Sequence, residues 1–377
     1  MSVTTYQVLL LPGDGVGPEV IGEAVRTLDM VAGQAGFGIE YVEGRIGGSA
    51  IDTHGVPLRD EEIEAAKQAD AILLGAVGGP AWDSQPRSNR PEAGLLKLRA
   101  SLGLFANLRP VKVFDALLDA SPLKPEIVRG VDLLIVRELT GGLYFGKPSK
   151  QWETSRGRRA VDTMIYREHE IERLVRLGYL LASGRRKKVT SVDKSNVLMT
   201  SQLWRAVTNE VAAEFPEVET EHVLVDSCAM RLIARPRDYD VMVMENMFGD
   251  ILSDEAAVLA GSLGMLPSAS LNGKKPSRRG SAGKQVGMYE PIHGSAPDIA
   301  GKGVANPTGA ILSAAMMLRI SFERDAEAGA VEAAVSDALN SGARTADIAA
   351  GGAAASTASM AEFGDEVRRH LARRLAE

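Results

Sequence analysis

Two carboxylates four residues apart, Asp250 and Asp254, are the residues of this chain whose spacing points most clearly to chemistry. On a helix, side chains four positions apart lie one above the other on the same face. Two carboxylates in that arrangement repel each other unless a cation lies between them, and Mg²⁺ takes one or two carboxylates together with oxygens of a substrate. The alternative is that both acids complement the positive N-terminus of a helix, an effect that fades after the first turn and explains Asp254 less well. The spacing therefore favours a divalent metal site.

The residues before these acids are expected to position them. Residues 241–244 are apolar, as in a short buried strand, and polar residues follow at Glu245 and Asn246. Gly249 is expected to break the chain before a helix that carries both aspartates. A strand end and a helix start would then gather four polar side chains, which supports metal binding.

Apolar strands that end in polar residues recur along the chain. In open α/β sheets, ligands bind at the carboxyl ends of the strands, so these ends are where chemistry is expected. Helical patterns separate the strands, which predicts an α/β architecture. The expected strands are 6–11, 71–74, 105–111, 133–136, 189–192 and 223–225, and the expected helices include 171–183 and 201–214.

A glycine-rich turn, residues 12–19, follows the first expected strand and leads into a helix that begins near Pro18. The glycine spacing is not that of the dinucleotide fingerprint, and no P-loop lysine follows. We interpret the segment as a tight strand-to-helix turn. Close approach of a ligand is the alternative.

One face of an expected helix at residues 91–99 carries Glu92, Leu95, Leu96 and Arg99. A core-facing stripe does not normally carry an acid and an arginine at its ends. The wall of a pocket would, with leucines for an alkyl group and a cation for a carboxylate. An amphipathic helix whose charged ends reach water is an equal alternative.

Two later segments could bind a nucleotide. Residues 288–301 expose much backbone and include His293 and Asp298. Their N–H groups could line a nucleotide while Asp298 accepts hydrogen bonds from a ribose; a surface loop is the alternative. The basic segment Lys274–Lys284 is interpreted as a solvated loop, with phosphate binding as the alternative.

Composition narrows the class of protein. The 377 residues are 45% hydrophobic, enough for about two to three domains. A net charge of −6 argues against a nucleic-acid scaffold. No apolar stretch approaches the length of a bilayer span, and the first residues lack the features of a secretion signal. The single cysteine, Cys228, excludes an intrachain disulfide and fits the cytoplasm.

Together these motifs resemble the isocitrate/isopropylmalate dehydrogenase family of metal-dependent, decarboxylating β-hydroxyacid dehydrogenases. The resemblance covers nearly the whole chain. It is carried by residues 11–17, 90–99, 105–110, 136–146, 192–194, 245–255 and 293–306.

The resemblance implies a two-domain α/β fold with a mixed, mostly parallel sheet that is not a true Rossmann fold. Residues 1–104 and 261–377 are expected to form a discontinuous cofactor-binding domain. Residues 105–260 are expected to form the domain for substrate, metal and dimerisation. Active sites shared between the two subunits of a homodimer are also implied.

The activity implied is oxidative decarboxylation of 3-isopropylmalate with NAD⁺, in leucine biosynthesis, with one Mg²⁺ or Mn²⁺ per active site. Each matching position takes a role from the family. Arg99, Arg109 and Arg137 match the arginines that hold the two malate carboxylates, and Asp250 and Asp254, with Asp226 of the partner subunit, match the metal ligands. Lys194 of the partner subunit matches the general base and Tyr144 the acid; Glu92, Leu95, Leu96 and Val197 match the alkyl pocket; Val16, His293, Gly294, Ser295, Ala296, Asp298, Ile299 and Asn306 match the cofactor site.

Other activities remain open from the sequence. Isocitrate oxidation requires a place for a third carboxylate, which Glu92 and two leucines would repel. Malate or tartrate oxidation is a weaker alternative. A phosphoryl-transfer enzyme would need a phosphate-cradling lysine motif that is missing, and a pure binding module does not explain polar residues at strand ends. An acid at Asp298 predicts NAD⁺ rather than NADP⁺.

Overall fold

A computed structural model of the chain describes residues 4–273, 286–349 and 357–376. The chain forms two compact units, each built from separate segments of the sequence. Unit 1 consists of Met1–Leu104, Val113–Gly130 and Ala257–Glu377; unit 2 consists of Phe105–Lys112 and Val131–Ala256. The stretch Val113–Gly130, which lies inside the predicted middle segment, belongs to unit 1. The basic segment Lys274–Lys284 lies outside the described residues.

The helices and strands of the described residues are these. Unit 1 contains β1 (Thr5–Gly13), α1 (Gly17–Ala35), β2 (Gly38–Glu43), α2 (Gly48–His54), α3 (Asp60–Gln68), β3 (Ala71–Ala76), α4 (Pro91–Leu102), α5 (Pro125–Val128), β11 (Pro267–Leu271), β12 (Gly287–Pro291), α10 (Thr308–Ile320), α11 (Asp325–Asn340) and α12 (Met360–Arg374). Unit 2 contains β4 (Ala106–Lys112), β5 (Asp132–Glu138), β6 (Lys150–Thr154), β7 (Gly157–Val161), α6 (Glu168–Ser183), β8 (Lys188–Asp193), α7 (Met199–Ala212), β9 (Glu219–Leu224), α8 (Val225–Ala234), β10 (Val241–Met244) and α9 (Asn246–Ala257).

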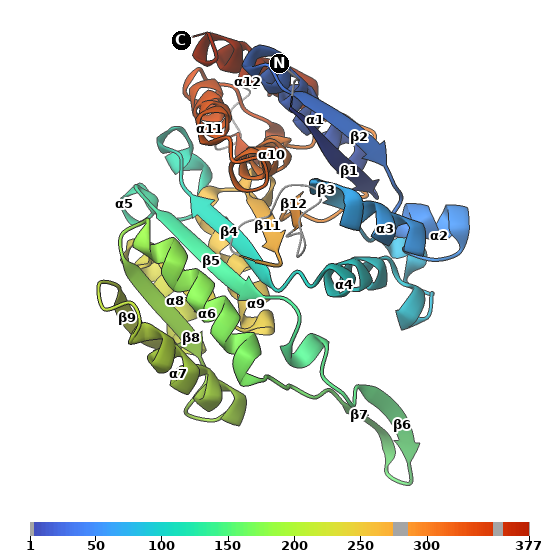
Figure 1. Ribbon diagram of the computed structural model, residues 1–377, viewed down its shortest axis with the longest axis vertical. Coiled ribbons are helices and arrows are strands. Elements are labelled where there is room, and N and C mark those ends of the chain that lie inside the picture. The colour runs from blue at the N-terminus through green and yellow to red at the C-terminus, as the bar shows by residue number, and fades with distance from the viewer. Residues whose placement is uncertain (1–3, 274–285, 350–356, 377) are drawn as a thin grey trace. The chain divides into compact units, whose positions relative to one another are not determined.

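Unit 1 is a sheet covered by helices on both faces (Figure 1). Its strands follow the order β2-β1-β3-β12-β11, in which only β11 runs antiparallel to its neighbour. Leu9 and Leu11 of β1 belong to a buried cluster with α3 and α4, whereas α1 and α10 also pack on the sheet. Because neighbouring side chains of a strand point to opposite faces, a strand covered on both sides is apolar throughout. This explains the continuous apolar run at β1 and β3.

Unit 2 is also built on a mostly parallel set of strands with helices packed on it. Its strands follow the order β4-β5-β10-β8-β9, in which only β4 runs antiparallel to its neighbour. Helix α6 packs closely on β10, and residue 178 is glycine at the contact. A Cβ there would lie 2.3 Å from Val243 Cγ1. Helix α7 packs beside α6, and α8 packs against β8 and β9.

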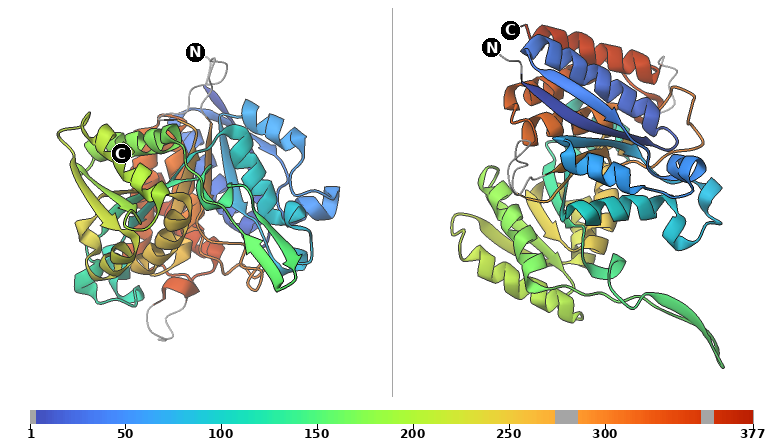
Figure 2. Two further views of the ribbon diagram at one scale, coloured as in Figure 1. Left: turned by 90° about the horizontal axis from the view of Figure 1, so that it is seen from below. Right: turned by 45° about the vertical axis from the view of Figure 1, so that its right-hand side comes forward.

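The strands β6 and β7 form a separate antiparallel ribbon in unit 2. Figure 2 shows the ribbon projecting from the rest of that unit. Most of its side chains are exposed.

The α/β prediction with a mixed, mostly parallel sheet is confirmed within each unit, and every strand expected from the sequence overlaps an observed one. Two local expectations were wrong. Gly249 does not break the chain, because α9 begins at Asn246 and passes through it. Val225, expected at a strand end, is the first residue of α8. No helix among the described residues is long and apolar enough to cross a membrane.

Candidate active site

The register of two strands brings two of the predicted arginines to one face of unit 2. β4 and β5 are antiparallel, with Asn107 opposite Arg137 and Arg109 opposite Ile135. Residues directly opposite each other, and residues two apart on one strand, point to the same face. Arg109 and Arg137 are therefore diagonal neighbours, and both are buried.

Arg137 is held by α9. Its Nε and Nη2 donate to Asn246 Oδ1 at 3.1 and 2.8 Å, and its Nη1 donates to Asp250. The approach is possible because residue 249 is glycine: a Cβ there would lie 2.5 Å from Arg137 Cγ. The glycine that was expected to precede the helix instead lies within it and makes room for an arginine.

Arg109 lies over the next turn of the same helix. Its Nε donates to Asn107 Oδ1 at 2.6 Å, and its Nη1 contacts Ser253 Oγ and, at 3.3 Å, Asp254 Oδ1. Each predicted metal ligand on α9 thus has a guanidinium beside it. Arginine suits this position because it stays charged and its planar fork matches carboxylates.

Tyr144 completes this group, since its hydroxyl donates to Asp250 Oδ2 at 2.8 Å. Burial, and then the hydrogen bond to Asp250, raise the pKa of Tyr144 to about 12. Burial also raises the pKa of Asp254; the charge of Arg109 opposes this effect and that of Asp250 adds to it. The phenol therefore keeps its proton at neutral pH and can donate it.

The alternative that Asp250 and Asp254 only cap a helix is not supported. The N-terminus of α9 is capped by Glu245, whose carboxylate accepts from the backbone N–H groups of Met247 at 3.0 Å and Phe248 at 2.9 Å. Asp250 lies beyond the first turn, because the helix begins at Asn246. The two aspartates therefore do not cap this helix.

Lys194 and Asp226 form a second group in unit 2. Lys194 follows β8, and its Nζ donates to Asp226 Oδ1, on the first turn of α8, at 2.7 Å. The pKa of Asp226 is lowered, first by this hydrogen bond. Among the described residues of one chain, no three acids, histidines or cysteines gather as a metal site. Val197, assigned to the alkyl pocket, is 66% exposed.

Helix α4 carries the remaining substrate residues, in unit 1. Arg99 is buried, and its Nη2 donates to Glu290 Oε1 on β12 at 2.6 Å. Arg99 Nε is also buried and has no hydrogen-bond partner among the described residues. Leu95 packs partly on the core cluster of unit 1, Leu96 is half-buried and Glu92 is exposed. The pocket-wall assignment of this face stays a prediction.

The predicted cofactor loop is held to the glycine-rich turn by its backbone. Val16 N donates to Ser295 O at 2.8 Å, and a Cβ at Gly15 would lie 1.9 Å from the same carbonyl oxygen. Gly15 also has a φ of +58°, where glycine is favoured. A side chain at residue 15 would therefore collide with the loop that packs on this turn.

The side chains of that loop differ in exposure. His293 Nδ1 lies 2.9 Å from Gly294 O, and its Nε2 is buried without a partner among the described residues. Burial lowers the pKa of His293. Asp298 is exposed, whereas Asn306 is buried and donates to Asp347 Oδ2 at 3.0 Å. Ala296 and Ile299 are half-buried.

Two residues that contribute to these groups, Glu290 and Ser253, were not assigned a role from the sequence, and Asn246 was assigned a different one. Asn246 was grouped with the metal but orients Arg137, Glu290 pairs with Arg99, and Ser253 binds Arg109. Glu290 had a signal, because it is an acid within the predicted cofactor segment. Asn246 had one as a polar residue at a strand end, whereas Ser253 had none, because its partner Arg109 lies 144 residues away.

Comparison with known proteins places the chain. The sequence model described as isocitrate/isopropylmalate dehydrogenase matches residues 7–367. The 3-isopropylmalate dehydrogenase of Geobacillus kaustophilus is 57% identical over 358 residues, covering 95% of this chain and 94% of that protein. The enzyme of the same name from Moorella thermoacetica is 53% identical, covering 97% and 99%.

Two solved structures are also similar to this chain over nearly its full length. The isocitrate dehydrogenase of Methylococcus capsulatus matches with a TM-score of 0.83 and 31% identity, over 97% of this chain and 99% of that one. A β-decarboxylating dehydrogenase of Thermococcus kodakarensis matches with a TM-score of 0.75 and 35% identity, over 98% and 96%. The match across nearly the full sequence shows that this chain belongs to the isocitrate/isopropylmalate dehydrogenase family.

Proposed function

We propose that this chain oxidises and decarboxylates (2R,3S)-3-isopropylmalate to 4-methyl-2-oxopentanoate and CO₂ with NAD⁺, as a step of leucine biosynthesis in the cytoplasm. The observation that carries the proposal is the group on α9, where two buried arginines lie beside two aspartates and a tyrosine. Relatives that bear the name of this activity, at 53–58% identity, support the choice of substrate.

The residues take roles that follow from their chemistry. Arg99, Arg109 and Arg137 bind the two carboxylates of the malate, because guanidinium pairs bidentately with carboxylate. Lys194 accepts the proton of the C2 hydroxyl. Tyr144 returns a proton to C3 after CO₂ leaves, and its raised pKa supports this role, because the phenol stays protonated.

Oxygen ligands from α9 fit a hard divalent cation. Asp250 and Asp254 would hold Mg²⁺ or Mn²⁺ together with Asp226 of the partner subunit, since carboxylates are the ligands these ions prefer. When bound, the ion would supply Lewis-acid charge during decarboxylation. Asp250 also orients Tyr144 and Arg137, so this chain's own side chains place the acid beside the substrate carboxylate.

The cofactor loop has a buried polar atom without a hydrogen-bond partner, which a dinucleotide could satisfy. The buried, unpartnered Nε2 of His293 can hydrogen-bond an adenine, and the exposed carboxylate of Asp298 can accept from ribose hydroxyls. When bound, NAD⁺ would supply the acceptor for the C2 hydride. A carboxylate at Asp298 would repel a 2′-phosphate, so turnover with NADP⁺ should be far lower. Equal turnover with both cofactors would contradict this assignment.

Steady-state kinetics with NAD⁺ and Mg²⁺ test the substrate. We expect 3-isopropylmalate to be turned over well, and isocitrate very poorly, because Glu92, Leu95 and Leu96 leave no cation for a third carboxylate. D-malate and tartrate, which lack the alkyl group, should be weaker substrates. Efficient oxidation of isocitrate, or of malate in preference to 3-isopropylmalate, would overturn the pocket assignment.

We also propose a homodimer whose subunits share active sites. Large apolar side chains on unit 2 are exposed, among them Met230 on α8 and Ile251 on α9, at 67% and 59%. Exposed apolar surface of this kind marks association sites. The three proposed metal ligands do not gather within one described chain, which supports Asp226 and its neighbour Lys194 being supplied by the partner.

Mixed dimers test the sharing directly. Lys194 could act in the partner's active site or in that of its own chain. In both cases a homodimer of Lys194→Met subunits and a homodimer of Asp250→Asn subunits should be inactive. If Lys194 acts in the partner's site, the purified mixed dimer has one intact site and about half of the parent activity. If Lys194 acts within its own chain, the mixed dimer has no intact site and stays inactive.

A further inference from the structure

The loop that carries Tyr144 begins at a buried carboxylate, that of Glu138, to which the proposed reaction gives no role. Glu138 is the last residue of β5, and its side chain is completely buried. Burial raises the pKa of this carboxyl group, and hydrogen bonds from Thr140 and Gly141 oppose the rise. Because a buried charge is costly unless other groups bind it, the partners of Glu138 show what it holds.

Glu138 binds the loop at two successive residues. Its Oε1 accepts from the backbone N–H and the hydroxyl of Thr140, at 2.9 and 2.7 Å, and its Oε2 accepts from Gly141 N at 2.7 Å. Arg173 on α6 supports the carboxylate, because its Nη2 lies 3.6 Å from Glu138 Oε1 and donates to Thr140 Oγ1 at 2.6 Å. The path of the backbone after β5 is therefore tied to this acidic side chain.

The same stretch of backbone packs against the ring of Tyr166. A Cβ at Gly141 would lie 2.8 Å from Tyr166 Cε1, and one at Gly142 would lie 2.4 Å from the Tyr166 hydroxyl oxygen. Gly142 also has a φ of +72°, where glycine is favoured, and its N–H donates to Ile165 O at 3.0 Å. The two glycines therefore let the backbone lie directly on Tyr166 while Glu138 binds its N–H groups.

Tyr144 takes its position from this backbone. The single helical turn Gly142–Tyr144 follows directly after the N–H groups that Glu138 binds. Tyr144 is 38% exposed, so packing alone constrains its ring only partly, and its hydroxyl donates to Asp250 Oδ2 at 2.8 Å. A shift of the turn would therefore move this hydroxyl away from Asp250.

We propose that Glu138 is a positioning residue for the reaction: its carboxylate fixes the loop that places the Tyr144 hydroxyl for proton delivery to C3. The inference rests on the proposed function, in which Tyr144 is the acid. A proton donor must lie within hydrogen-bond reach of the atom that it protonates, so a small displacement of the loop slows this step. Glu138 acts through Tyr144, because its own side chain is completely buried and its oxygens bind the loop.

Glu138→Gln tests the proposal, because the amide keeps the size of the side chain but leaves one oxygen to accept from the two N–H groups. We expect kcat for 3-isopropylmalate to fall about tenfold or more, with a smaller change in the KM for NAD⁺. The solvent deuterium isotope effect on kcat should rise, because a badly placed hydroxyl makes the proton transfer slower than the other steps. A merely structural role would leave this isotope effect unchanged, and that result would overturn the proposal.

A double-mutant cycle with Tyr144→Phe shows whether Glu138 acts through the phenol. Once the hydroxyl is absent there is nothing left to position, so Glu138→Gln should cause no further loss of kcat in that background. Equal losses in both backgrounds would contradict the proposal. Thr140→Val keeps both N–H groups and removes only the hydroxyl that donates to Glu138, so it should cause the same pattern at smaller size even if Glu138→Gln folds poorly.

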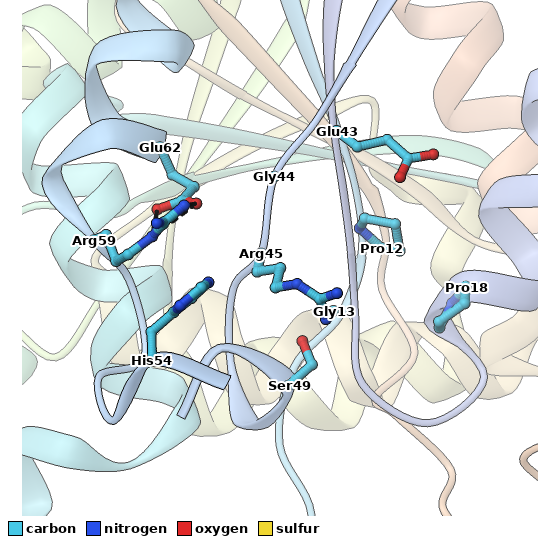
Figure 3. A pocket seen from close by; sticks show the side chains of 10 residues that line it. All are labelled: Pro12, Gly13, Pro18, Glu43, Gly44, Arg45, Ser49, His54, Arg59 and Glu62. Atoms are coloured by element: carbon cyan, nitrogen blue, oxygen red, sulfur yellow. Dashed lines mark hydrogen bonds and ion pairs between the residues drawn. The ribbon is translucent and has the colours of Figure 1, made fainter. Parts of the chain in front are cut away.

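Glu62→Gln is the matched control, because it also removes a buried carboxylate, in unit 1. Figure 3 shows Glu62 meeting Arg59 at the wall of a cavity, where Arg59 Nη2 lies 2.5 Å from Glu62 Oε1. This variant should lose stability but keep the kcat and the isotope effect of the parent. If the parent does not oxidise 3-isopropylmalate, the proposed function fails and Glu138 has no such role. If the parent is active and Glu138→Gln is equally active, only the inference about Glu138 fails.

Discussion

The residues around Asp250 in unit 2 and the predicted cofactor loop in unit 1 are held in different ways. In unit 2 the residues bind one another through side chains, as Arg137 and Tyr144 do at Asp250. In unit 1 the cofactor loop is fixed by its backbone. Val16 N donates to Ser295 O, and the Glu19 carboxylate accepts from the N–H groups of Gly301 and Gly303.

The difference follows from the role that we propose for each group. Side chains that stabilise charge must be oriented before the substrate arrives, and complementary charges provide that orientation. A loop that binds a dinucleotide through N–H groups needs a defined backbone path, which depends on close packing and on glycine. Substitutions of charge should therefore affect the group around Asp250 most, and substitutions of volume should affect the cofactor loop most.

The largest effect is expected for Asp250→Asn. The substitution removes a charge that Arg137 and Tyr144 both use and that the cation would need. We expect kcat to fall by more than about a hundredfold. This loss is larger than the one usually seen when a residue that only hydrogen-bonds a metal ligand is replaced. Asp238→Asn, at an exposed acid of the same unit, is the control and should change nothing. Parent-like turnover of Asp250→Asn would disprove the role of α9.

A smaller effect is expected for Asn246→Ala, which removes the acceptor of two hydrogen bonds from Arg137. The arginine would lose its orientation, so kcat/KM for 3-isopropylmalate should fall about tenfold while the KM for NAD⁺ stays unchanged. Asn246→Asp keeps an acceptor and should restore part of the activity. A loss shared equally by both substrates would indicate a general structural role instead.

In unit 1, Gly15→Ala should raise the KM for NAD⁺ and lower stability by about 1–3 kcal/mol, because the new Cβ meets Ser295 O. Gly36→Ala is a matched control: Gly36 has a φ of +71°, but no atom lies within 4 Å of a Cβ built there. Both variants carry similar backbone strain. The difference between them in urea unfolding and in cofactor titration therefore measures the effect of the contact with Ser295 O. Equal effects would show that strain alone matters.

The smallest effect concerns pH. Burial lowers the pKa of His222 in unit 2, whose Nε2 lies 2.8 Å from Asn209 Oδ1. As the pH falls below about 6.5, the unfolded chain therefore takes up this proton before the folded chain does, and folding loses stability. The difference between the urea midpoints of unfolding at about pH 7.5 and about pH 5.5 should be smaller in His222→Gln than in the parent. An unchanged difference would exclude His222 as a contributor.

Much of unit 2 follows from short stretches of the amino-acid sequence. The spacing of Asp250 and Asp254 predicted carboxylates on one helical face, and apolar runs ending in polar residues predicted the strands. These features are local, since helix and strand periods can be read from neighbouring residues. Resemblance to a family supplied the arginines, Tyr144 and Lys194, which no local period would have singled out.

How these residues are held depends instead on the tertiary structure. The pairing of Asn107 with Arg137 put two arginines on one face, and the room at Gly249 let Arg137 reach Asn246. The bond between Arg99 and Glu290 joins residues 191 positions apart. Such contacts depend on strand register and on the packing of distant segments, which no short window of sequence encodes.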